Sequence, residues 1–209
     1  MNIFWAQLNI GCLSRNRFWG ESEEKAYRKA ECTSTIICSG NECILVDPGV
    51  EKEKMKFLLD RRCGLPIERV STIFFTHLHA DHRVDAACYS GIRMVATKEE
   101  IQDNFEEIGK VGWFEALEAA KEELIPGVKV VRLPGHTRGC AGLAFDGRDG
   151  KILIAGDAVM TRSFFEQEQG YFNSYNHEEA RNSIRHIRKD YTLIVPGHDI
   201  LFYNREYGK

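Results

Sequence analysis

The stretch FFTHLHADH, residues 74–82, places three of the chain's seven histidines and one aspartate at the end of an apolar run. The β-branched and aromatic residues 72–76 predict a buried strand. Packing alone gives no reason for three imidazoles and a carboxylate within six residues, and burying them unpaired would be costly. We therefore interpret His77, His79, Asp81 and His82 as candidate metal ligands that follow a buried strand.

Three other apolar runs end in the same way, with a small residue or turn and then a residue type that binds metals. Residues 130–133 precede Pro-Gly-His136, residues 152–155 precede Gly-Asp157, and residues 193–195 precede Pro-Gly-His198. Strand ends of layered α/β folds gather at one rim, where loops on a rigid scaffold form sites. Imidazole nitrogen and carboxylate oxygen suit Zn²⁺, with Fe or Mn as alternatives. The seven candidates exceed the need of one tetrahedral ion and suffice for two.

Length and composition bound the protein class. The 209 residues, 43% of them hydrophobic, fit one domain over residues 1–209 with a substantial core. The formal net charge of −3 and the absence of a basic block predict no nucleic-acid or anionic-membrane partner. We expect a small-molecule substrate, and the sequence leaves a homodimer open.

Cysteine usage and the N-terminal residues favour the cytoplasm. The seven cysteines are odd in number, irregularly spaced and without a C-x-x-C pair, so we expect most of them to be reduced, small and buried. Polar residues interrupt the N-terminal apolar residues, which is unlike a signal peptide. No stretch approaches the roughly 20 apolar residues of a membrane span.

Short apolar strands and amphipathic helices alternate along the chain. The patterns predict two hairpins, one joining residues 35–38 and 43–46 and one turning at residues 146–150, and further strands at residues 72–76, 93–96, 128–133, 141–145, 152–155 and 192–195. Helices are predicted at residues 51–62 and 113–124, and after capping boxes that begin at Thr97 and Asn176. This mixture predicts an α/β fold of layered sheets covered by helices.

The motif and its three companions resemble the metallo-β-lactamase superfamily. His77, His79, Asp81 and His82 match that family's His-x-His-x-Asp-His motif, and His136, Asp157 and His198 match its downstream ligands. Val-Asp47-Pro-Gly also resembles the family's early Asp-x-Gly turn. The resemblance covers about residues 33–200 and implies a four-layer αβ/βα sandwich, with two mixed sheets flanked by helices.

The same resemblance implies a division of the ligands between two ions. His77, His79 and His136 would hold the first metal, Asp81, His82 and His198 the second, and Asp157 would bridge them. This is the glyoxalase II and lactonase pattern. Common β-lactamases use a cysteine among the ligands of the second metal, whereas Asp157 stands here.

The family resemblance implies a metal-dependent hydrolase. We expect a dinuclear zinc enzyme in which a metal-bridging hydroxide attacks a small-molecule ester, thioester or lactone. Asp81 is the candidate catalytic residue, because a carboxylate beside the second metal could also shuttle a proton. Asp47 either orients a ligand imidazole or serves only as a turn residue. The alternative is a mononuclear iron persulfide dioxygenase-like enzyme, which shares the motif and a similarly short chain.

Several segments are candidates for the substrate pocket. The aromatic residues 15–21 lack strand or helix patterning, and the aromatic-rich loop of residues 160–176 directly follows Asp157. Trp113 and Phe114 lie in a candidate lid. Arg83 follows the motif where the family usually keeps small residues. It either reaches a substrate carboxylate or forms a structural pair with Asp85.

Overall fold

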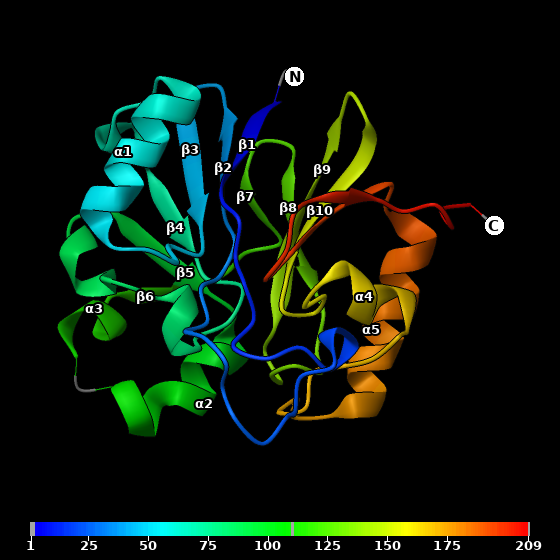
Figure 1. Cartoon of the computed structure of the whole chain (residues 1–209). Coiled ribbons are helices and arrows are strands. Elements are labelled where there is room, and N and C mark those ends of the chain that lie inside the picture. The colour runs from blue at the N-terminus through cyan, green and yellow to red at the C-terminus, as the bar shows by residue number, and fades with distance from the viewer. Residues whose placement is uncertain (1–2, 110, 209) are drawn as a thin grey trace.

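The computed structural model describes residues 3–109 and 111–208 and contains two six-stranded sheets that pack face to face (Figure 1). The first sheet contains, in order, β1 (Ile3–Asn9), β2 (Ser34–Ser39), β3 (Glu42–Val46), β4 (Thr72–Phe74), β5 (Arg93–Ala96) and β6 (Leu117–Ala119). The second sheet has the order β12-β11-β10-β9-β8-β7, with β7 (Glu123–Ile125), β8 (Val128–Arg132), β9 (Ala141–Gly147), β10 (Gly150–Gly156), β11 (Leu193–Pro196) and β12 (Phe202–Tyr203).

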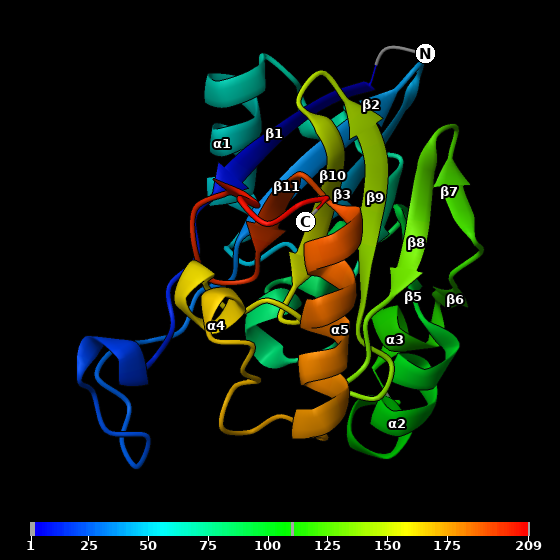
Figure 2. The same ribbon diagram turned by 90° about the vertical axis from the view of Figure 1, so that its right-hand side faces the viewer.

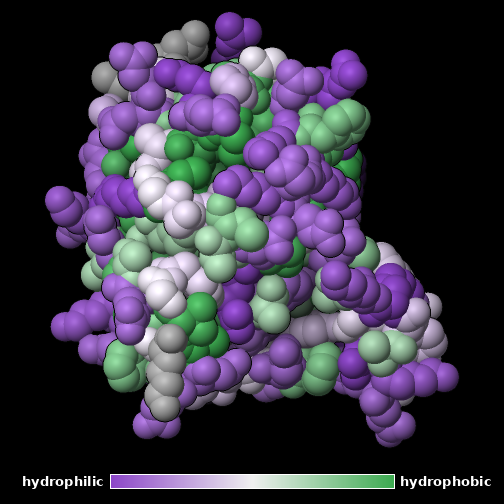
Figure 3. Space-filling view, turned by 90° about the vertical axis from the view of Figure 1, so that its left-hand side faces the viewer, coloured by the Kyte–Doolittle hydropathy of each residue, from purple (hydrophilic) through white to green (hydrophobic). Residues whose placement is uncertain are grey.

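Helices cover the outer face of each sheet. The first sheet carries α1 (Lys52–Cys63), α2 (Lys98–Ile108) and α3 (Gly112–Glu115), whereas the second carries α4 (Arg162–Glu166) and α5 (His177–Asp190). Short 3-10 turns lie at Arg17–Trp19, Ile67–Arg69, Ala80–His82 and Ala86–Tyr89. Figure 2 shows α5 lying across the second sheet, and Figure 3 shows the opposite side of the molecule, where hydrophilic residues surround apolar patches. The predicted four-layer αβ/βα sandwich is confirmed.

Alternating side chains hold the four layers together. In β2, Ile36 packs toward the helices of the first sheet, and its neighbour Ile37 packs between the sheets. In β10, Ile154 lies between the sheets, while Leu153 packs against Ile184 of α5. Side chains of a strand point alternately to opposite faces, so strands that are covered on both faces are apolar throughout. This explains why the predicted strands appear as continuous apolar runs.

Both sheets are mixed, and this places several strand ends at the same edge. In the first sheet β3, β4, β5 and β6 run parallel, and in the second β10 and β11 run parallel. The chain therefore leaves β4, β10 and β11 in loops that meet between the two sheets. The candidate ligands lie in these loops.

Most predicted elements are present, and the predicted N-caps act as caps. The Thr97 hydroxyl accepts a hydrogen bond from the backbone N–H of Glu100, and the Asn176 side chain accepts from Glu178 and Glu179. The predicted helix at residues 113–124 is wrong. Only α3 is helical there, and Leu124 and Ile125 enter β7 because they fill the space between the sheets.

The cysteines depart from expectation at one hairpin. Cys38 and Cys43 pair across β2 and β3 as a disulfide, because the hairpin register places them opposite one another. The other five cysteines are free, and Cys32 and Cys140 among them are buried as predicted. Over the described residues, no helix is both long and apolar enough to cross a membrane. The assignment of residues 1–209 to a single domain stays a prediction.

Candidate metal centre

The seven candidate ligands converge between the two sheets. His77, His79, Asp81 and His82 follow β4, and the last two lie in the Ala80–His82 turn. His136, Asp157 and His198 follow β8, β10 and β11. The ligand atoms form one group of His77, His79, His136 and Asp157 and another of Asp81, His82 and His198, with the atoms of each group within 4.8 Å of one another.

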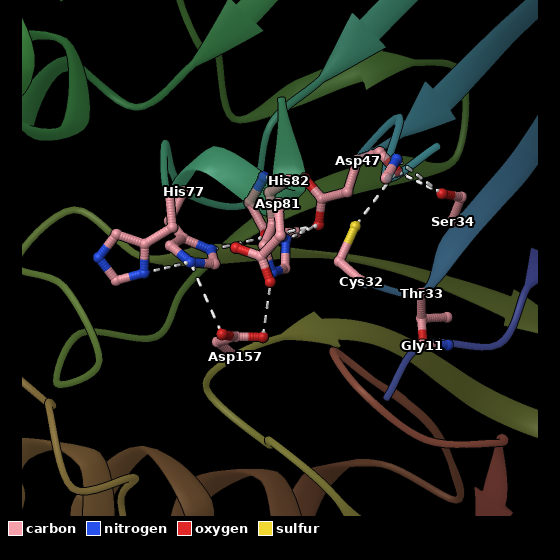
Figure 4. A network of polar contacts seen from close by, with 12 residues as sticks. Gly11, Cys32, Thr33, Ser34, Asp47, His77, Asp81, His82 and Asp157 are labelled. Atoms are coloured by element: carbon pink, nitrogen blue, oxygen red, sulfur yellow. Dashed lines mark hydrogen bonds and ion pairs between the residues drawn. The ribbon is translucent and has the colours of Figure 1, made fainter. Parts of the chain in front are cut away.

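Asp157 lies between the two groups, and its carboxylate contacts imidazoles of both (Figure 4). Its Oδ2 lies 3.2 Å from His136 Nε2 and 3.7 Å from His77 Nε2. Its Oδ1 lies 3.3 Å from His82 Nε2, and His198 Nε2 lies 3.3 Å from each of the two oxygens. One carboxylate thus faces both imidazole sets, which is the arrangement of a carboxylate that bridges two cations.

Several buried ligand atoms lack a hydrogen bond. Within the described part of the chain, His82 Nε2 and Asp157 Oδ1 are buried and have no hydrogen-bonding partner, although they lie close to each other. Unpaired buried polar atoms cost roughly 1–3 kcal/mol each, so native proteins rarely leave them unsatisfied. These atoms and the mixed imidazole and carboxylate set fit a divalent metal such as zinc.

The protonation states also suit cation binding in the first group. Burial lowers the pKa of His77 well below its ordinary value, lowers that of His79, and lowers that of His136 to about 4. Burial alone would raise the pKa of Asp157, but the imidazoles of His198, His82 and His136 lower it well below the ordinary range. Neutral imidazole and ionised carboxylate are the forms that bind metals.

Asp47 orients the ligands from behind. It follows β3 in the left-handed backbone region, with φ +49, and its Oδ2 lies 3.0 Å from His82 Nδ1. The same carboxylate accepts hydrogen bonds from the Thr76 backbone N–H at 2.8 Å and the Thr76 hydroxyl at 2.7 Å. Ser34 in turn donates to the Asp47 carbonyl oxygen at 2.6 Å (Figure 4). Asp47 therefore occupies a turn and also positions an imidazole, so it is more than a turn residue.

Residues 28–198 match the metallo-beta-lactamase superfamily, and the two ligand groups lie within that span. The chain belongs to the metallo-beta-lactamase superfamily. Its two histidine and aspartate clusters are those expected of a metal-dependent hydrolase of this superfamily.

Relatives within the superfamily include lactonases. An N-acyl homoserine lactonase from a Bacillus species is 28% identical over 151 residues, which cover 67% of this chain and 60% of the lactonase. The chain therefore spans less than two thirds of the length of that relative. The structure of a Bacillus thuringiensis AiiA variant with N-decanoyl-L-homoserine bound at the active site has a TM-score of 0.68, 18% identity and coverage of 90% and 88% of the two chains. A probable metal-dependent hydrolase from Staphylococcus aureus has a TM-score of 0.76, 13% identity and coverage of 98% and 93%. At these identities the structural likeness shows the fold.

Two further features complete the positioning of this superfamily site. His198 Nδ1 lies 2.9 Å from the Glu31 carbonyl oxygen and 3.2 Å from that of Cys12, which directs Nε2 toward Asp157. Gly197 is required beside it, because a Cβ atom there would lie 1.9 Å from Asp157 Oδ1. The sequence signals the Pro-Gly-His turn but does not show this close approach.

Glu100 is a supporting residue that the sequence assigned only to a capping box. Its buried carboxylate accepts from the Leu78 backbone N–H at 3.0 Å and from the Thr137 hydroxyl. Thr97 donates to the Gly139 carbonyl oxygen at 2.6 Å. The start of α2 thus joins the loop of His77 and His79 to the loop of His136. The buried carboxylate needs these partners, and burial raises its pKa.

Arg83 does not line the cleft beside the ligands. Its Nε donates to the Leu78 carbonyl oxygen at 2.8 Å, and its guanidinium lies 5.9 Å from the Trp113 ring centroid. Asp85 instead accepts from the backbone N–H of Lys52 at the start of α1. Arg83 and Asp85 therefore have structural roles, but they contact different partners and do not form the pair that the sequence suggested. Phe114 is buried in the first sheet's core, so neither it nor Trp113 forms the predicted lid.

A cleft of about 310 Å³ opens onto the ligands. Its wall contains His79, Asp81, His136, Asp157 and His198, together with Leu13, Ser14, Arg15, Ala30, Ala80, Met160, Tyr171, Phe172 and Asn173. Both predicted pocket segments thus contribute, residues 15–21 through Arg15 and the 160–176 loop through four side chains. Phe164 and Phe165 of that loop are instead core residues. A larger hollow of about 550 Å³ adjoins the cleft at Ala30, Ala80 and Asp81.

Proposed function

We propose that the chain is a dinuclear zinc hydrolase that cleaves a small-molecule ester, thioester or lactone. The observation that supports this proposal is the position of Asp157, whose carboxylate contacts imidazoles of both groups of ligand atoms, with Oδ2 near His136 and Oδ1 near His82. A site for one ion would need only one of these groups. The burial of His82 and His198 argues against their being chance neighbours.

In this proposal His77, His79 and His136 hold one zinc, Asp81, His82 and His198 hold the other, and Asp157 touches both. When bound, the cations would lower the pKa of a water between them and polarise a substrate carbonyl. The chain's own contribution is to fix the ligands. Asp47 holds the imidazole of His82, and the carbonyl oxygens of Cys12 and Glu31 hold that of His198.

Asp81 is the proposed catalytic carboxylate of the second group. Its Oδ2 lies 3.6 Å from His198 Nε2, and its side chain is 25% exposed where that of Asp157 is 4% exposed. Asp81 also lines the cleft. A carboxylate that touches both the ligand cluster and the open cleft is placed to move a proton between a reacting group and solvent.

The cleft and the relatives support the proposed substrate class. The cleft combines apolar residues such as Leu13 and Met160 with a few polar groups, as sites for small organic molecules do. The Bacillus lactonase relative supports a cyclic ester within this class.

Metal content and a substrate panel test the proposal together. We expect about two zinc ions per purified chain by elemental mass spectrometry, and turnover of at least one member of a panel of lactones, esters and thioesters. Chelation should abolish this turnover and zinc should restore it. One iron per chain, with oxygen uptake on glutathione persulfide, would contradict the proposal and support the persulfide dioxygenase.

A matched pair of variants separates the site from the rest of the chain. His79→Ala should remove activity, because His79 lies in the first ligand group. His186→Ala is the control, since the imidazole of His186 pairs at the surface with Asp190 on α5. Full activity in His79→Ala would show that the proposed site is wrong.

A further inference from the structure

The cleft beside the ligands contains a cation that the catalytic proposal does not use. Among the described residues, Arg15 is the one arginine or lysine in the cleft wall. Over residues 3–109 and 111–208, no carboxylate oxygen lies within 4.0 Å of its guanidinium. Arg83, which the sequence offered as a binder of a substrate carboxylate, faces away from this wall. The free guanidinium at the cleft is therefore that of Arg15.

Several contacts fix Arg15 in place. Its Nη1 donates to the Glu23 carbonyl oxygen, and its guanidinium carbon lies 4.9 Å from the ring centroid of Phe172. The hydroxyl of Tyr171 donates to the Arg15 carbonyl oxygen at 2.9 Å. The surrounding loop projects from the body beside α4 (Figure 2). These contacts hold both ends of the side chain, so little rotamer entropy remains to be lost on binding.

The acidic residues near Arg15 are already paired with other arginines. Glu21 forms an ion pair with Arg28. Glu23 Oε1 lies 3.6 Å from Arg17 Nε, although over the described residues this buried oxygen accepts no hydrogen bond. Arg15 Nε is buried and has no hydrogen-bonding acceptor among the described residues. Nη2 also has no hydrogen-bonding acceptor among the described residues and is not buried, so it is the donor that a carboxylate in the cleft can reach.

We propose that Arg15 binds a carboxylate on the substrate, so that the preferred ester, thioester or lactone is anionic. This inference rests on the proposed hydrolase and sharpens its substrate class. A neutral substrate would leave the Arg15 donors without an acceptor in the cleft, whereas a carboxylate would satisfy them. Arg15 is thus a specificity residue that acts at a distance from the reacting carbonyl.

Paired esters of increasing length test the inference with the zinc-loaded full chain. The anionic set contains the 4-nitrophenyl monoesters of succinate, glutarate and adipate. The neutral set contains 4-nitrophenyl butanoate, pentanoate and hexanoate, which match them in carbon number. We expect the wild type to prefer the anionic ester at the length that spans from the ligands to Arg15.

Arg15→Gln should lower kcat/KM for that anionic ester about tenfold to hundredfold, mainly through KM, because one charged hydrogen-bonding partner is lost. The neutral esters should change less than about twofold. Arg15→Lys should retain part of the preference for the anionic ester, since lysine keeps the positive charge but lacks the planar guanidinium. Arg181→Gln is the control, because Arg181 is exposed on α5 outside the cleft wall, and it should keep the full preference.

A second measurement keeps the inference separate from the hydrolase proposal. Calorimetric binding of glutarate should weaken about tenfold in Arg15→Gln and stay unchanged in Arg181→Gln. If no ester is hydrolysed, the hydrolase proposal fails while glutarate binding still tests Arg15. Equal loss for anionic and neutral esters, or unchanged glutarate binding in Arg15→Gln, would overturn the inference.

Discussion

The two ligand groups of the candidate metal centre differ in the pKa values of their imidazoles. His77 and His136 of the first group have pKa values lowered by burial. In the second group burial also acts to lower the pKa of His82 and His198. The pKa of His82 is nevertheless raised well above its ordinary value by the carboxylates of Asp157 and Asp47, and that of His198 is raised by Asp157. Each group also contains one partly exposed ligand, His79 in the first and Asp81 in the second.

This contrast in pKa predicts which of the two groups binds its metal ion more tightly. The first group presents neutral imidazoles, so a cation binds there without displacing protons. The second group holds protons that a cation must displace. We therefore expect the first group to bind its metal more tightly, with Asp157 joining the two because it faces both.

The largest effect should come from removing the link between the groups. Asp157→Asn keeps the side-chain shape but removes the charge that faces both ligand sets. We expect kcat/KM to fall by at least about a thousandfold, since both metals lose a ligand. Steady-state hydrolysis of the best panel substrate measures this effect. Asp146→Asn, on the exposed end of β9, is the control, and a similar loss there would point to general unfolding.

Variants of one ligand from each group should lose metals differently. His198→Ala should retain about one zinc per chain, because the neutral first group is intact. His79→Ala should bind zinc more weakly overall, because it disrupts that group. Elemental analysis after dialysis against a weak chelator measures both. Equal retention by the two variants would contradict the difference between the groups.

Removing the charge of Asp47 should weaken metal binding by the second group more than by the first. Asp47→Asn weakens the contact with His82 Nδ1, and loss of such an orienting partner typically costs about 10- to 100-fold in metal affinity. Competition with a zinc indicator measures the affinity of each site. The exposed Asp60→Asn on α1 is the control. A loss of affinity confined to the tighter site would show that Asp47 supports the first group, contrary to this prediction.

Acid should release the two metals at different pH values, which is the smallest of these effects. Raised imidazole pKa values in the second group mean that protons displace its metal at a higher pH. The first group keeps its imidazoles neutral further into acid, toward the pKa of about 4 of His136. Metal content after dialysis across a pH series should therefore fall in two steps. A single step would show that the two groups release their metals at the same pH.

The strand ends were predictable from sequence because each combines an apolar run with a metal-ligand type, as in Ile154 and Asp157. The contacts that hold the ligand loops in place were less predictable. Glu100 reads as a capping residue because local spacing cannot show that its carboxylate reaches Leu78 and Thr137 from α2. Arg15 carries no motif, and only the folded loop brings it beside Phe172. Residues 113–124 mimic a helix because their apolar spacing does not reveal that Leu124 belongs between the sheets.

The most direct test of the two-group site is a crystal structure of the zinc-loaded protein with anomalous diffraction measured at the zinc absorption edge. The account predicts two peaks, one among His77, His79 and His136 and one among Asp81, His82 and His198, with one oxygen of Asp157 directed at each. A single peak, or two peaks that Asp157 does not bridge, would contradict it.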